Sequence, residues 1–165
     1  MKLRTLVTGL VAVALSMSVA SCSNNDAQPV PATSTWPSGI TEGLIKTGIT
    51  DFMNEYKDCL ANPPVAAHNK MAGNTVAKYC ASHNSHAVAN FSKAIAKNGA
   101  AAKGLDPVTC LKKFPDSFKV NTATVVKDTE GFGAVTEKLG SKTQQVYFQV
   151  KMYSTHIQML SNTCP

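Results

Sequence analysis

Apolar positions along this chain change their spacing twice, and each spacing predicts a different kind of structure. An uninterrupted run of apolar and small residues covers positions 6–17. Between Ile40 and Leu60 the apolar residues recur at steps of three and four, which is typical of one buried helix face. After Pro115 the repeat shortens to two, which is typical of half-buried strands. The order predicts helices first and a sheet afterwards.

The first predicted helix covers residues 40–60, with Thr41 and Glu42 at its start and Asn62-Pro63-Pro64 as its stop. Residues 65–81 predict one or two further short helices, interrupted near Gly73-Asn74. The first helix should bury a single apolar stripe. Its members are Leu44, Ile45, Ile49, Phe52, Met53, Tyr56 and Leu60.

Two more helices are expected before the sheet. Ser85 is a suitable N-cap for a helix that continues to Lys97, and Asn98-Gly99 is a typical C-terminal stop. Asp106 followed by Pro107 resembles an N-cap with proline at the first helical position, so a brief helix is predicted over 106–113.

The remaining pattern predicts strands over 118–126, 132–139, 143–153 and 156–160, joined by short turns. Helices followed by a three- to four-stranded antiparallel meander make this an α+β chain. On the first strand one face is expected to carry Phe118, Val120, Thr122, Thr124 and Val126. The face with Phe118, Val120, Val146, Phe148 and Val150 should pack on the helical stripe, either as a closed core or around an apolar pocket.

The N-terminus has the features of an export signal. Lys2 and Arg4 precede the apolar run, which is too short to span a bilayer as a helix. Val19-Ala20-Ser21-Cys22 follows and resembles the bacterial lipobox. That resemblance implies a lipoprotein signal peptide over 1–21 and diacylglycerol with fatty acids such as palmitate on Cys22. It also implies a location on the extracytoplasmic face of the bacterial cell membrane; an ordinary secretory signal with a chance cysteine is the alternative.

Downstream of Cys22 the composition divides the chain into a tether and a domain. Residues 22–39 are polar, contain three prolines and predict a flexible tether. Residues 40–165 predict a single disulfide-containing α+β domain. The chain has 16 basic and 10 acidic residues, and Arg4 is its only arginine, so the mature charge is 14 lysines against 10 acids. A modest excess of lysine without arginine argues against a nucleic-acid partner and is compatible with weak attraction to anionic lipid.

Four cysteines remain after Cys22, an even number that predicts two disulfides in an oxidising compartment. Their spacings contain no CxxC pair and do not resemble a zinc framework. Four thiols allow three pairings, which spacing alone does not separate. The pairing predicted here is Cys59–Cys80, which ties the end of the first helix to the following helix, and Cys110–Cys164, which ties the C-terminal strand to the short helix before the sheet.

Candidate chemistry is sparse. His83 and His86 are three residues apart, and His68 lies in the same half of the chain, so together they could ligate a metal or haem iron. The competing interpretation is that these are solvated polar side chains, since no carboxylate lies nearby in sequence to orient them. No GxSxG, HExxH or SxxK motif occurs in the mature chain, so no enzyme activity and no cofactor are predicted.

The element order over residues 40–164 is similar to the NTF2-like fold, in which helices precede a curved sheet that forms a cone. Ser154-Thr155 replaces the Gly-Trp type of turn usual before the last strand of that family. Because the fold serves enzymes and binding modules alike, it does not decide function. The sequence therefore predicts an envelope lipoprotein that binds a protein or a small apolar ligand. The alternatives are a metal- or haem-binding lipoprotein that uses His83 and His86, and a prophage-type superinfection-exclusion lipoprotein.

Overall fold

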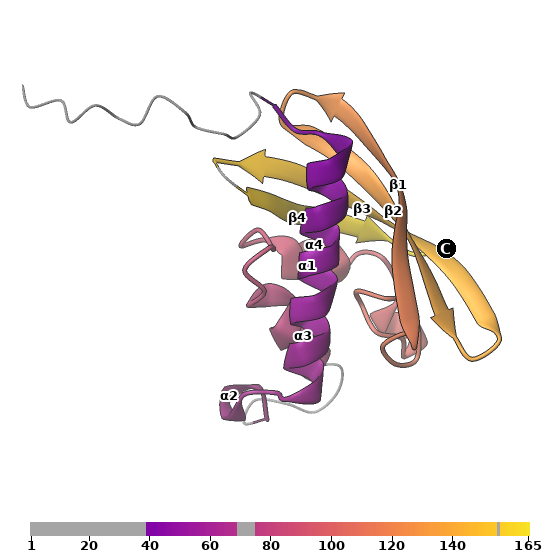
Figure 1. Ribbon diagram of the computed structural model, residues 1–165. Coiled ribbons are helices and arrows are strands. Elements are labelled where there is room, and N and C mark those ends of the chain that lie inside the picture. The colour runs from indigo at the N-terminus through magenta and orange to yellow at the C-terminus, as the bar shows by residue number, and fades with distance from the viewer. Residues whose placement is uncertain (1–38, 69–74, 155) are drawn as a thin grey trace, which may run out of the picture. The chain divides into compact units, whose positions relative to one another are not determined.

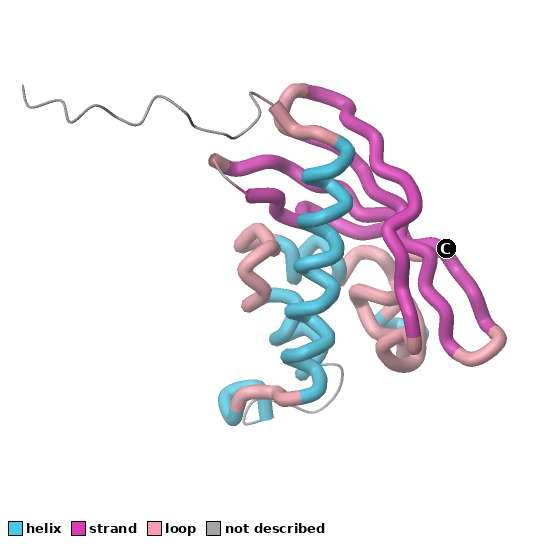
Figure 2. Tube along the Cα trace, viewed as in Figure 1, coloured by secondary structure: helices cyan, strands magenta, loops and turns pink. Residues whose placement is uncertain are grey.

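The computed structural model describes residues 39–68, 75–154 and 156–165. The predicted signal peptide, Cys22 and the tether up to residue 38 lie outside these ranges, as do Gly73 and Asn74. The described residues belong to one compact unit. Helices lie on one side of a four-stranded sheet (Figure 1, Figure 2).

The long helix is α1 (Glu42–Ala61), and its prediction is confirmed. Thr41 Oγ1 accepts a hydrogen bond from Leu44 N over 3.2 Å, so the N-cap satisfies one of the free amides of the first turn. Asn62 ends the helix ahead of the two prolines. The buried side of α1 follows the predicted stripe and comprises Ile45, Gly48, Ile49, Phe52, Met53 and Tyr56.

The other helices are short: α2 (Val65–His68), α3 (Thr75–Ser82), α4 (Phe91–Ile95) and the single 3₁₀ turn η1 (Ala101–Lys103). Cys59 and Cys80 form a disulfide that joins the last turn of α1 to α3. This bond is one of the two pairings expected from the sequence, and the structure contains it.

The helix predicted from Ser85 to Lys97 is wrong in its first half. Ser85 does not cap a helix, because its amide and hydroxyl both donate to the carboxylate of Glu55 on α1, over 2.8 and 2.6 Å. The chain from 85 to 90 instead makes turns, and α4 begins only at Phe91. A contact over 30 residues of sequence therefore outweighs the local capping preference of serine.

The brief helix predicted over 106–113 is also absent. Asp106 does act as a cap, since Oδ1 accepts from the amides of Val108 and Thr109, and the amide of Cys110 donates to the Asp106 carbonyl. Cys110 has a left-handed φ of +59°, so the helical conformation stops after a single turn. We call residues 106–111 the Asp106 turn.

The sheet is an antiparallel meander in the order β1 (Ser117–Lys127), β2 (Glu130–Leu139), β3 (Lys142–Tyr153), β4 (His156–Thr163). Gly140, with φ of +59°, lies in the tight turn between β2 and β3, where a left-handed residue suits the twist of the hairpin. Ser154 takes a similar conformation between β3 and β4. The α+β class and the meander are thus confirmed.

One face assignment on β1 is wrong. Val120 pairs with Val135 and Thr122 with Ala134, so Asn121 is an extra residue in the strand, a β-bulge. Beyond it the side-chain alternation shifts by one: Ala123 is buried, whereas Thr122 and Thr124 are exposed. A second irregularity near Val126 leaves that side chain 53% exposed.

The core lies between α1 and the inner face of the sheet. Phe52 of α1 and Phe148 of β3 meet with ring centres 5.7 Å apart, and both are fully buried. Gly133 of β2 lets α1 lie close to the sheet, because a Cβ there would collide with Ile49 Cδ1. Of the two outcomes left open by the sequence, these residues form a closed core.

Candidate functional site

A group of polar side chains is buried where α1, the Asp106 turn, β2 and β3 meet. Asp106 has both carboxylate oxygens engaged: Oδ1 accepts from the amides of Val108 and Thr109 over 2.9 and 2.8 Å, and Oδ2 accepts from Tyr56 Oη over 2.7 Å. Tyr56 is fully buried and Asp106 is 9% exposed. The carboxylate therefore joins the Asp106 turn to the C-terminal half of α1.

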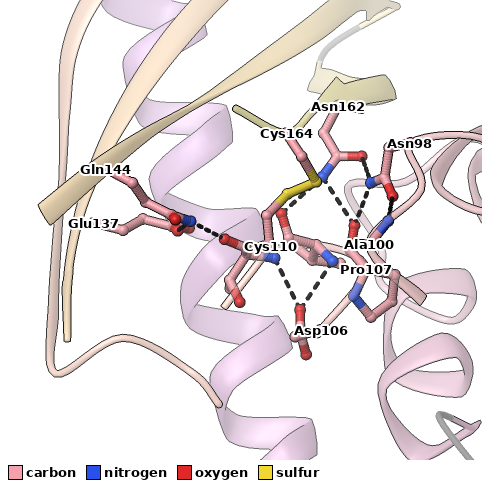
Figure 3. Close-up of a disulfide and its surroundings, with 11 residues drawn as sticks. Asn98, Ala100, Asp106, Pro107, Cys110, Glu137, Gln144, Asn162 and Cys164 are labelled. Carbon is pink, nitrogen blue, oxygen red and sulfur yellow. Dashed lines mark hydrogen bonds between the residues drawn. A yellow bond between two sulfur atoms is a disulfide. The ribbon is translucent and has the colours of Figure 1, made fainter. Parts of the chain in front are cut away.

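Glu137 of β2 is the second carboxyl group, and it too is fully buried. Gln144 Nε2 of β3 lies 3.1 Å from Glu137 Oε2 and 2.7 Å from the Thr109 carbonyl, donating toward both (Figure 3). Glu137 Oε1 and Thr109 Oγ1 are buried, and neither has a hydrogen-bond partner among the described residues. Such atoms are uncommon in folded proteins because a buried polar group without a partner costs free energy.

The surroundings of Glu137 change its protonation. Burial raises its pKa from 4.5 to about 8; the hydrogen bond from Gln144 lowers it and the nearby charge of Asp106 raises it. At neutral pH the protonated form of Glu137 is therefore favoured. Burial, and secondarily the charge of Asp106, also raise the pKa of Tyr56 well above its ordinary value of 10.0. The buried polar cluster thus combines one engaged carboxylate with one proton-bearing carboxyl group.

The second disulfide fixes the Asp106 turn to β4. Cys110 and Cys164 are bonded, as expected from the sequence. Asn162 Nδ2 donates to the carbonyls of Pro107 and Val108 over 3.0 and 2.7 Å, and Asn98 Nδ2 donates to Asn162 Oδ1 over 2.9 Å (Figure 3). These bonds of Asn98 and Asn162 join the Asp106 turn to β4 and to the segment after α4. The buried polar cluster therefore holds α1, the Asp106 turn and the sheet together, and its Glu137 carboxyl group favours the protonated form.

The histidines singled out from the sequence have different surroundings. The His83 ring stacks on Tyr79 with centres 3.9 Å apart, and its Nδ1 is 3.0 Å from Ser82 Oγ. His86 is half-buried, and its Nδ1 has no hydrogen-bond partner among the described residues. The side chain of His68 lies outside what the structure describes. Within residues 39–68, 75–154 and 156–165, no group of three or more His, Cys, Asp or Glu side chains could hold a metal ion.

A shallow surface hollow of about 230 Å³ lies between α1 and β4. Asp51, His86 and His156 contribute to its lining. The His156 ring is engaged elsewhere, since its Nε2 lies 3.1 Å from Gln158 Nε2, the neighbouring residue on the same side of β4. His86 and His156 therefore line the same hollow but do not form one binding site.

The face of the sheet directed away from α1, here called the outer face, is covered by no described helix. Strand alternation and the pairing registers place Phe132, Tyr147 and Tyr153 on it, and they are 44%, 49% and 40% exposed. On β3, Tyr147 and Tyr153 thus lie opposite the inward-facing Val146, Phe148 and Val150. Large apolar side chains grouped on one exposed face mark an interaction surface more often than scattered ones do.

The charged side chains of the outer face are mostly lysines. Glu130 is the acidic residue placed there, and its carboxylate lies 3.3 Å from Lys151 Nζ and 3.9 Å from Lys127 Nζ. Lys151 Nζ is also 5.8 Å from the centre of the Tyr153 ring. Lys119 and Lys138 are exposed at the opposite end of the face. Four lysines against one glutamate give this face a net charge of +3.

The sequence pattern does not reveal the polar roles of Tyr56, Glu137 and Gln144. Tyr56 belongs to the predicted apolar stripe, which is correct for its ring but says nothing of its hydroxyl group. Only the inward direction of Glu137 could be predicted, because it follows Val135 by two residues and therefore lies on the same face of the strand. The aromatic Phe132 lies one residue before Gly133 and therefore on the outer face by the same rule.

Comparison with known proteins gives no relative. No family model matches the chain, and neither curated proteins nor solved structures show significant similarity to it. Among the described residues, no helix has the length and apolar character needed to cross a membrane.

Proposed function

We propose that this chain is a lipid-anchored binding module of the bacterial cell envelope, without enzymatic activity, and that the outer face is its binding surface. The observation that carries the proposal is the exposure of Phe132, Tyr147 and Tyr153 on one sheet face that no described helix covers. Aromatic side chains supply much of the binding energy at protein interaction sites, so three of them left in solvent are best explained by a partner.

The location within the envelope is supported by two independent features of the chain. Val19-Ala20-Ser21-Cys22 resembles the lipobox, and its cysteine would carry the lipid. The other four cysteines form two disulfides in the domain, which suits an oxidising compartment outside the cytoplasm. A diacylated cysteine provides at least two chains, which makes an anchor much more stable than a single one.

We propose no enzymatic role because the side chains that could do acid–base chemistry are buried together in one cluster. These side chains are Tyr56, Asp106 and Glu137. The likeness to the NTF2-like fold also stays a proposal. It is supported by the order of the elements, with α1 and three shorter helices ahead of a four-stranded meander.

The anchor is tested with the full chain expressed in a bacterium and labelled with a fatty acid. Cys22→Ser should abolish the label and release the protein from the membrane fraction, because the thioether requires the sulfur atom. Ser21→Ala keeps the sulfur and serves as the matched control, which should label like the unaltered chain. A Cys22→Ser protein that still labels and sediments with membranes would overturn the anchor.

The binding surface is tested by sedimentation of the exported Cys22→Ser chain with fragments of bacterial cell envelope. Tyr147→Ala and Phe132→Ala should reduce the bound fraction. Val65→Ala is the control, because Val65 on α2 is 74% exposed and lies off the sheet. Absence of binding by the unaltered surface, or equal binding by all variants, would contradict the proposal.

A further inference from the structure

The outer face combines aromatic rings with many neutral hydrogen-bonding side chains. The registers place Thr122, Thr124, Gln145, Gln149 and Ser161 around Phe132 and Tyr147. These hydroxyl and amide groups both donate and accept hydrogen bonds. Flat rings beside such groups suit a ligand that has apolar C–H surfaces and hydroxyl groups on the same unit, and sugar rings have both.

The aromatic rings follow the direction of β3. Phe132 pairs with Gln149 and is therefore a diagonal neighbour of Tyr147, at a distance of about 7–8 Å between backbones. Tyr153 lies six residues beyond Tyr147 on the same side of the strand, about 20 Å away. The three rings thus line an extended surface, which suits an elongated polymer better than a compact ligand.

The charges of the face form two groups, one on each side of Tyr147 and Phe132. Lys119 and Lys138 occupy one end, and the salt bridges described above leave them without an ion-pair partner among the described residues. Lys127 and Lys151 lie at the other end with Glu130. A chain with anionic groups at intervals would meet lysine on both sides of Tyr147 and Phe132, and the Tyr153 ring just beyond Lys151.

We propose that the outer face binds an acidic glycan, a polymer of sugar rings that carry carboxylate or phosphate groups. This inference rests on the proposed binding function and names the class of its ligand. A bilayer surface fits less well, because the side chains between the rings are polar and do not form an apolar wedge that could insert. An acidic polypeptide would use the lysines but gives the rings no sugar face on which to stack.

The test is titration of the exported Cys22→Ser chain with polygalacturonate, a uronic-acid polymer. Tyr147→Ala should weaken binding about tenfold or more, since aromatic anchors dominate such contacts. Lys119→Gln and Lys138→Gln should each weaken it about two- to fivefold and reduce its salt dependence. Val65→Ala and Lys57→Gln alter an exposed apolar and an exposed charged residue on α2 and α1, and should change nothing.

Three further probes separate the ligand classes: dextran as a neutral glycan, polyglutamate as an acidic polypeptide, and vesicles half composed of phosphatidylglycerol. Binding as tight to any of these as to polygalacturonate would overturn the acidic-glycan assignment. Failure to bind polygalacturonate, with binding to envelope fragments retained, would overturn this inference and leave the proposed function standing. Loss of envelope binding as well would remove both.

Discussion

Gln144 and Glu137 face each other across β3 and β2, and the side-chain amide of Gln144 donates to the buried carboxyl group over 3.1 Å. The same amide nitrogen lies 2.7 Å from the Thr109 carbonyl of the Asp106 turn. One side chain therefore connects the sheet, the turn and the proton-bearing carboxyl group. Because burial outweighs this single hydrogen bond, the pKa of Glu137 is raised to about 8.

This raised pKa predicts a stability that falls as the pH rises. Between pH 4.5 and about 8 the folded chain keeps a proton on Glu137 that the unfolded chain has released, so higher pH favours unfolding. The slope from this group is at most roughly 1.4 kcal/mol for each pH unit. Urea denaturation at intervals from pH 4 to 9 measures it.

Glu137→Gln is the control for the pH prediction. The amide keeps the size of the side chain but does not titrate, so the free energy of unfolding of this variant should depend less on pH across the same range. Asp106→Asn does not serve, because its carboxylate accepts from two backbone amides and Tyr56. Parallel curves for the unaltered chain and Glu137→Gln would contradict the assigned pKa.

Tyr56→Phe should destabilise the domain by about 1–3 kcal/mol, because it leaves Asp106 Oδ2 without its donor inside the protein. The measurement is the free energy of unfolding near pH 6. Tyr147→Phe is the matched control: its hydroxyl group donates to exposed Gln145, and its loss should cost less than about 0.5 kcal/mol. Equal effects of the two substitutions would show that the buried hydroxyl contributes no more than the exposed one.

The parts of the fold that the sequence predicted well are those set by local periodicity. The stripe of α1 and the alternation of β3 are long and regular, so the hydrophobic pattern alone is enough to place Phe52 and Phe148 in the core. The β1 face failed after Val120, since a single bulge residue, Asn121, reverses the alternation and has no distinctive local signal. The Ser85 helix failed because Glu55, far away in sequence, takes the hydrogen bonds that a cap would use.

The buried polar cluster could not be assembled from the sequence. Its members Tyr56, Asp106, Glu137 and Gln144 come from four separate segments, and only the tertiary fold brings them together. The outer face was partly predictable, since the alternation of β3 already placed Tyr147 and Tyr153 on one side. Its neighbours on β2 required the register between the strands, which the turn at Gly140 fixes.

Two glycines of α1 should respond in opposite ways to alanine. A Cβ at Gly48 would lie 2.5 Å from Ile157 Cβ on β4, so Gly48→Ala should cost about 1–3 kcal/mol through overpacking. At Gly43 the nearest atom is Thr41 Oγ1 at 3.8 Å, so Gly43→Ala should stabilise by about 0.5–1 kcal/mol through helix propensity. Thermal unfolding of both variants checks the pair, and stabilisation by Gly48→Ala would mean that α1 does not lie so close to β4.

The two disulfides should contribute unequally to stability. Cys59–Cys80 closes 21 residues of chain and Cys110–Cys164 closes 54, so restriction of the unfolded chain predicts about 3 and about 4 kcal/mol. Loss of the second bond has a further effect, because it releases the Asp106 turn from the end of β4.

Paired alanine variants test both bonds by urea denaturation, first at one pH and then across the pH range. The pairs are Cys59→Ala with Cys80→Ala and Cys110→Ala with Cys164→Ala. The second pair should be the less stable and should also show a weaker pH dependence, since loosening the Asp106 turn lets water reach Glu137 and lowers its pKa. A larger loss of unfolding free energy from the first pair would contradict this ranking. An unchanged pH dependence in the second pair would show that the disulfide does not keep water away from Glu137.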